Sequence, residues 1–136
     1  MSMDIHNFEE YSSSKKSLTV AQMKGIHQDI IKNIQGDQDA SELYEDFVSA
    51  SIKYAEIRAE WSLMSREQKM DKDPLRTALH NAVIIQVNML ARYLAQIGRS
   101  TSWRNLLGNE EEDRIYRKTI GDFACYISFV NALCSR

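Results

Sequence analysis

The strongest constraint on this chain is a repeat of apolar side chains at steps of three and four residues, found in four long stretches. Residues at this spacing share one face of an α-helix, because a helix turns once in about 3.6 residues. In the first stretch, Thr19 to Ile34, the repeat includes Val20, Ile26 and Ile30. One proline and five glycines leave little room for the many turns of an all-β fold. The pattern therefore predicts an all-α protein.

Capping residues predict where the second helix lies. Gly36 ends the first helix, because glycine readily takes the left-handed cap conformation. Asp39, with Glu42 three residues later, has the pattern of a capping box at a helix N-terminus. We expect this second helix to end near Ser65 and to be followed by a charged connection over residues 66–72.

The third helix has the most apolar face. Asp73 and Pro74 predict its start, because aspartate caps free amides and proline fits the first helical position. It is expected to run from Pro74 to Ile97 and to end at Gly98. Its apolar stripe is wider than a surface helix needs, so we expect it to be central or covered by a second subunit. The residues that widen the stripe are Ile84, Ile85, Met89 and Ala91.

A short helical turn is expected at Thr101–Leu107, before the last long helix. Asn109 and Glu112 repeat the capping-box pattern. The last helix is expected over Glu110–Leu133. Gly121 inside it costs about 1 kcal/mol relative to alanine, which predicts the close approach of a neighbouring helix.

The length of 136 residues fits one domain. We expect residues 1–17 to form a polar, flexible tail, with Ile5, Phe8 and Tyr11 as the apolar edge of an alternative short helix. Residues 18–136 then form a single helical domain. Four long helices with short connections predict an antiparallel four-helix bundle with one short extra helical turn.

Charge and composition bound the partners. The formal net charge is −2, without the basic excess of a nucleic-acid binder, so nucleic acid is not an expected partner. The longest uncharged run, residues 77–91, is too short and polar for a membrane span. No secretory signal is recognisable near the first residue. Cys125 and Cys134, nine residues apart on one helix, face opposite sides and predict no disulfide. We therefore expect a cytoplasmic protein.

The sequence lacks the short motifs of common enzymes. No phosphate-binding P-loop, dinucleotide fingerprint, serine-hydrolase elbow, HExxH or CxxC motif occurs. Three histidines and no Glu-x-x-His pair argue against a metal site. Arg76 and His80 resemble the Arg–His motif of HEPN ribonucleases, but they enclose three residues instead of four to six. We expect neither an enzyme nor a cofactor.

A polar group on the third and last helices is the main candidate site. It comprises Arg76, His80 and Asn81 on one helix and Arg117 and Asp122 on the other. Three interpretations stay open: a satisfied network that fixes helix register, a polar pocket for an anion or small ligand, and acid–base catalysis by His80. Further basic residues of the last helix are Arg114 and Lys118.

A second candidate lies in the short helical turn. Trp103 is flanked by the basic residues Arg99 and Arg104. We expect Trp103 and Arg104 to form a surface contact point for a partner.

Four segments carry a family resemblance: RTALHN (76–81), LARYL (90–94), TSWR (101–104) and RKTIGDFACY (117–126). Together they resemble a small family of uncharacterised helical proteins from Gram-positive bacteria. The resemblance covers roughly residues 70–136. It implies an all-α bacterial protein and assigns no catalytic residue.

Three functions are compatible with these observations. The first is a protein-interaction or regulatory module, expected to be a homodimer because of the wide apolar stripe of the third helix. The second is a small-molecule or anion binder. The third is a bacteriocin-immunity-like role, suggested only by size and helical class.

Overall fold

The computed structural model describes residues 18–108 and 117–134. The predicted tail over residues 1–17 and the predicted cap at Asn109 and Glu112 lie outside these ranges. The described residues contain helices and no strand, which confirms the all-α class. The helices are α2 (Val20–Ile34), α3 (Gln38–Trp61), α4 (Arg66–Gln96), α5 (Ser102–Leu106) and α6 (Arg117–Cys134).

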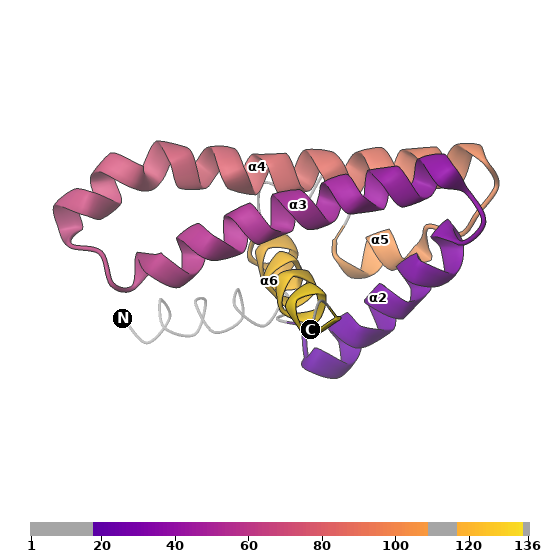
Figure 1. The fold of residues 1–136 in the computed structure, drawn as a ribbon, viewed down its shortest axis with the longest axis horizontal. Helices are drawn as coiled ribbons and strands as arrows, with labels where there is room; N and C mark the ends of the chain where they lie inside the picture. The colour runs from indigo at the N-terminus through magenta and orange to yellow at the C-terminus, as the bar shows by residue number, and fades with distance from the viewer. Residues whose placement is uncertain (1–17, 109–116, 135–136) are drawn as a thin grey trace, which may run out of the picture.

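The two longest helices form the frame of the molecule. Helices α3 and α4 lie side by side and run in opposite directions (Figure 1). Helix α6 packs mainly on α3 and is seen nearly end-on in Figure 1, while α3 and α4 lie across the view. Helix α2 lies diagonally to this pair and ends close to the start of α3 (Figure 1). The predicted antiparallel arrangement of all four long helices is not confirmed, because only α3 and α4 share a common axis direction.

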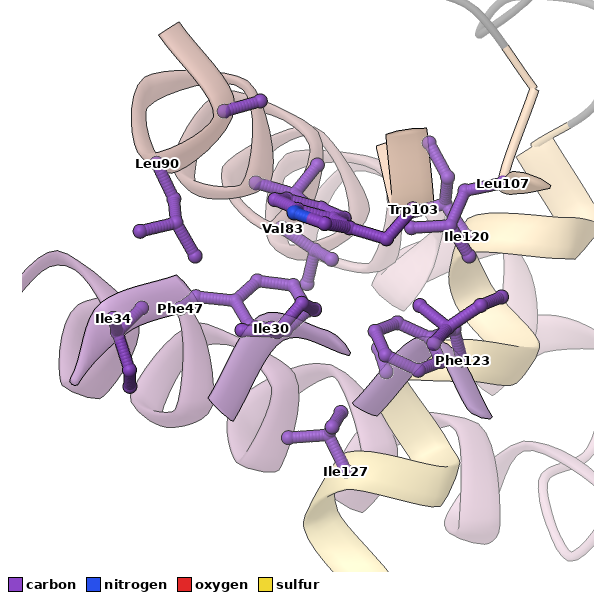
Figure 2. Packing of buried hydrophobic residues seen from close by; sticks show 14 of the residues in the cluster. Ile30, Ile34, Phe47, Val83, Leu90, Trp103, Leu107, Ile120, Phe123 and Ile127 are labelled. Carbon is purple, nitrogen blue, oxygen red and sulfur yellow. The ribbon is translucent and has the colours of Figure 1, made fainter. Parts of the chain in front are cut away.

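The core lies where α2, α5 and α6 meet the α3–α4 pair. Phe47 of α3 and Phe123 of α6 stack with ring centroids 6.0 Å apart. Fully burying such a side chain stabilises the fold by roughly 1.5–3 kcal/mol. The apolar residues that close around these rings include Ile30, Val83, Leu90, Trp103, Leu107, Ile120 and Ile127 (Figure 2).

The start of α3 differs from the prediction. The N-cap is Asp37, whose carboxylate accepts from the amide of Ala40 at 2.9 Å. Asp39 lies inside the first turn. Asp37 is the N-cap because its extended backbone suits a capping position. Its carboxylate also accepts a hydrogen bond from the Tyr93 hydroxyl of α4 at 2.7 Å. The helix ends at Trp61, before the predicted Ser65.

Helix α4 begins eight residues before the predicted start at Pro74. Ser65 is the N-cap and forms a capping box with Gln68, so the expected connection over residues 66–72 is helical. Pro74 lies inside the helix, where it donates no hydrogen bond and favours a kink. The first part of α4 bends in Figure 1. The capping box thus outweighs the proline as a start signal.

The glycines predicted to end the first and third long helices are found at the ends of α2 and α4. Gly36 and Gly98 both have positive φ, 77° and 78°, and each directly follows the C-cap residue of its helix, α2 or α4. These are left-handed conformations that glycine adopts without steric cost.

The wide stripe of α4 is buried only in part. Val83, Val87 and Leu94 are fully buried against the other helices. Ile85 and Met89 are 57% and 43% exposed. Of the four residues that widen the stripe, Ile85 and Met89 therefore face outward in the single chain, whereas Ala91 is buried and Ile84 packs against the core.

Within the described ranges, every helix is too short or too polar to traverse a lipid bilayer.

Candidate functional site: a basic pocket between α3, α4 and α6

A cavity of about 460 Å³ opens where α3, α4 and the start of α6 meet. This volume lies in the range of small-molecule sites. Its cationic side chains come from all three helices, and one carboxylate faces it. The lining residues are Tyr54 and Arg58 of α3, Asp73, Arg76, Thr77 and His80 of α4, and Lys118 of α6.

Asp122 of α6 holds two of these cations in place. Its Oδ1 lies 2.5 Å from the Nη2 of Arg58, and its Oδ2 lies 3.4 Å from the Nζ of Lys118. Desolvation by burial opposes the charge on Arg58, but the hydrogen bond and attraction from Asp122 outweigh it and raise the pKa of Arg58. Arg58 is therefore charged, and Asp122 holds both side chains at one wall of the pocket.

Arg76 forms the opposite side of the pocket. Its guanidinium carbon lies 4.5 Å from the centroid of the Trp61 ring, which is a cation–π contact. Its Nη2 lies 3.5 Å from the Oδ1 of the exposed Asp73. Its Nε is buried and has no hydrogen-bond partner in the described part of the chain. The ring fixes Arg76 in position while leaving it donor capacity.

His80 and Tyr54 form the floor. His80 is 5% exposed, and its ring meets that of Tyr54 edge-to-face at 5.0 Å. Burial raises the pKa of Tyr54 above its ordinary value of 10.0. The phenol therefore stays protonated at neutral pH and is a hydrogen-bond donor.

Gly121 creates the space that these α3 side chains occupy. A Cβ at this position would lie 3.0 Å from the Tyr54 hydroxyl oxygen and 3.2 Å from the Nη1 of Arg58. The predicted close approach of a neighbouring helix at Gly121 is thus confirmed, and that helix is α3.

The structure brings part of the predicted site together. Arg76 and His80 line one pocket, and Asp122 supports it through Arg58 and Lys118. Asn81 is exposed on α4 and does not line the pocket. Arg117 is the first residue of α6, and its side chain lies outside the described parts of the structure.

Sequence reasoning missed Tyr54 as a site residue and Arg58 altogether. A signal existed for Arg58, because it follows Tyr54 by four residues and so lies one turn further along the same side of α3. A cationic side chain beside a buried aromatic ring is a candidate for an ion pair with a carboxylate on another helix.

The expected surface contact at Trp103 and Arg104 is wrong. Trp103 is fully buried and Arg104 is 5% exposed. The Nε of Arg104 donates to the Oδ1 of Asn88 at 2.8 Å, and its Nη1 donates to the carbonyl of Gly108. Helix α5 folds against the core, so both side chains hold the fold together.

The cysteines have different surroundings. Cys125 is half-buried beside Arg58, and Cys134 is exposed; both are free thiols. Burial raises the pKa of the Cys125 thiol, which opposes formation of the nucleophilic thiolate. Among the described residues, no group of three histidine, cysteine or acidic side chains is placed to hold a metal ion.

The fold and pocket define an all-helical protein with a basic cavity floored by aromatic rings. No family model, curated protein or solved structure matches the chain. The resemblance to the Gram-positive family stays a prediction.

Proposed function

We propose that this protein binds a small anionic ligand in the basic pocket between α3, α4 and α6. The observation that carries the proposal is the convergence of Arg58, Arg76 and Lys118, from three helices, on one cavity. Cations held close together in a partly desolvated site attract an anion more strongly than isolated surface cations do.

A purely structural network explains these contacts less well. Three cations line or border the cavity, while Asp73 and Asp122 supply two carboxylates. Asp73 is 57% exposed and 3.5 Å from Arg76, a geometry worth at most about 1 kcal/mol. An incoming anion therefore displaces only a weak contact at Arg76.

We propose that the pocket binds its ligand and does not catalyse a reaction. His80 is buried against Tyr54. This position suits a residue that lines the base of the pocket better than one that transfers protons to a substrate. The pKa of the nearby Cys125 thiol is raised, so this cysteine is a poor nucleophile.

Thermal unfolding in matched salts tests the proposal. A ligand that binds only the folded state raises the melting temperature. We expect phosphate or sulfate to raise it relative to chloride at equal ionic strength. The increase should be lost in Arg58→Gln and Arg76→Gln and kept in Lys24→Gln, an exposed cation of α2 outside the pocket. Equal melting curves in all three salts would refute anion binding.

A second candidate function is self-association through the outer face of α4. Ile85 and Met89 are large, exposed and one helical turn apart, beside the buried Val83 and Val87 of the same helix. This proposal keeps the expected homodimer, with a second copy covering the stripe. Light scattering during size-exclusion chromatography should then give a molar mass twice that of one chain. The Ile85→Lys variant should have the mass of a monomer. A wild-type monomer would end this candidate. The immunity-like role stays a prediction from size and helical class.

A further inference from the structure

The charge around the pocket favours one class of anion. The lining carries Arg58, Arg76 and Lys118 against Asp73, and the supporting carboxylate Asp122 is shared between two of the cations. The lining alone thus has two positive charges in excess, and its net charge stays positive when Asp122 is included. A dianion gains more from such a site than a monoanion does, because Coulomb energy scales with ligand charge.

The donor types also discriminate between anions. Two guanidinium groups present planar forks suited to the paired oxygens of a phosphoryl group. The ammonium of Lys118 and the phenol of Tyr54 add donors from two other positions on the wall. Donors that come from several sides fit a tetrahedral anion with oxygens in several directions better than a flat carboxylate.

The cavity is larger than a phosphoryl group alone requires. Its 460 Å³ corresponds to the liquid volume of roughly 15 water molecules. The ring of Tyr54, which also lies 6.0 Å from the guanidinium of Arg58, supplies an apolar surface beside the cations. There is room for an organic group attached to the phosphate.

We infer that the ligand is an organic phosphate monoester, with its phosphoryl group held by Arg58, Arg76 and Lys118 and its organic group against Tyr54. Asp122 is a positioning residue, because it orients two of the three cations. The inference rests on the proposed anion-binding function and names the ligand class for that pocket.

The test is calorimetric titration of the wild-type protein at about pH 8 with four probes. Phenyl phosphate, benzenesulfonate and benzoate share one ring and differ in the anionic group, and inorganic phosphate lacks the ring. At this pH a phosphate monoester is a dianion. We expect phenyl phosphate to bind at least about tenfold more tightly than the sulfonate or carboxylate. Inorganic phosphate should bind more weakly than phenyl phosphate.

The outcomes separate the two proposals. If none of the four probes binds, the anion-binding function fails, and the ligand class fails with it. Equal binding of the three ring compounds would keep the anion-binding function and overturn the phosphate class. Inorganic phosphate binding as tightly as phenyl phosphate would overturn the ester in favour of free phosphate.

Variants locate the phosphate within the pocket. Arg76→Lys keeps the charge but removes the fork, so we expect it to lower phenyl phosphate affinity. Lys24→Gln is the control for lost surface charge. Circular dichroism confirms that each variant is folded. Unchanged phenyl phosphate affinity in Arg76→Lys would contradict a phosphoryl group at Arg76.

Discussion

At the residue scale, Gly121 shows how a missing side chain shapes the pocket. The space beside its Cα is taken by the ends of two α3 side chains, Tyr54 and Arg58. Arg58 reaches Asp122 from this position. A glycine inside a helix weakens the helix. At this position the glycine also allows close contact between α3 and α6.

Gly121→Ala is predicted to weaken anion binding with little change in stability. The new Cβ would press on Tyr54 and Arg58, while alanine favours the helix by about 1 kcal/mol. Calorimetric titration and urea unfolding measure the two effects. The matched control is Gly25→Ala in α2, where a Cβ meets no atom within 4 Å. That variant should gain stability and keep its affinity. Unchanged affinity in Gly121→Ala would show that the close packing does not serve the pocket.

Arg104→Ala is predicted to destabilise the fold by roughly 2–4 kcal/mol, because it removes charged hydrogen bonds and buried packing. Arg104 is 5% exposed and donates to Asn88 and Gly108. Arg66→Ala, on the exposed first residue of α4, is the control and should change stability by less than about 0.5 kcal/mol. Urea unfolding measures both. A stable Arg104→Ala protein would contradict the structural role of this arginine.

Half of the site was predictable at this scale. Arg76 and His80 are four residues apart, so helix geometry alone places them on one side of α4. Arg58 and Tyr54 join them only through the packing of α3 on α4. Such a contact depends on how helices cross, and residue spacing within one helix carries no information about it.

At the element scale, the apolar repeat predicted which segments are helical, and the caps were less reliable. Asp39 and Pro74 are both good start signals in isolation. Asp37 and Ser65 are the caps that the structure uses. Asp37 gains a tertiary partner in Tyr93. Local signals of similar strength compete, and contacts distant in sequence decide between them.

Asp37→Asn is predicted to reduce the loss of stability in acid. Hydrogen bonds from Ala40 and Tyr93 lower the pKa of Asp37 below 3.8 in the folded state. A lowered carboxyl pKa adds stability above the unfolded pKa, and this is lost as pH falls through the folded pKa. Asparagine keeps the cap but removes the charge.

Urea unfolding between about pH 3 and pH 7 measures this effect. The wild type should lose more stability at the acid end than Asp37→Asn, which should be the less stable protein at neutral pH. Asp39→Asn, an exposed aspartate in the same helical turn, is the control and should follow the wild type. Parallel pH curves for wild type and Asp37→Asn would contradict a charged cap joining α3 to α4.

At the scale of the whole molecule, the sequence predicted the all-helical class but not the crossing of the helices. An apolar stripe indicates which face of a helix is buried, and several crossing angles bury the same stripe. Helix α6 lies across the α3–α4 pair in Figure 1, and this crossing brings Lys118 and Asp122 to Arg58. The pocket is a product of that crossing.

Nuclear magnetic resonance of the arginine Nε–Hε groups tests whether an anion binds between α3, α4 and α6. Phenyl phosphate would be added to the isotope-labelled wild-type protein at constant ionic strength. We expect saturable shifts at Arg58 and Arg76, which face the pocket, and none at the exposed Arg66 and Arg92. Shifts absent from Arg58 and Arg76, or equal at all four arginines, would contradict a specific anion site between α3, α4 and α6.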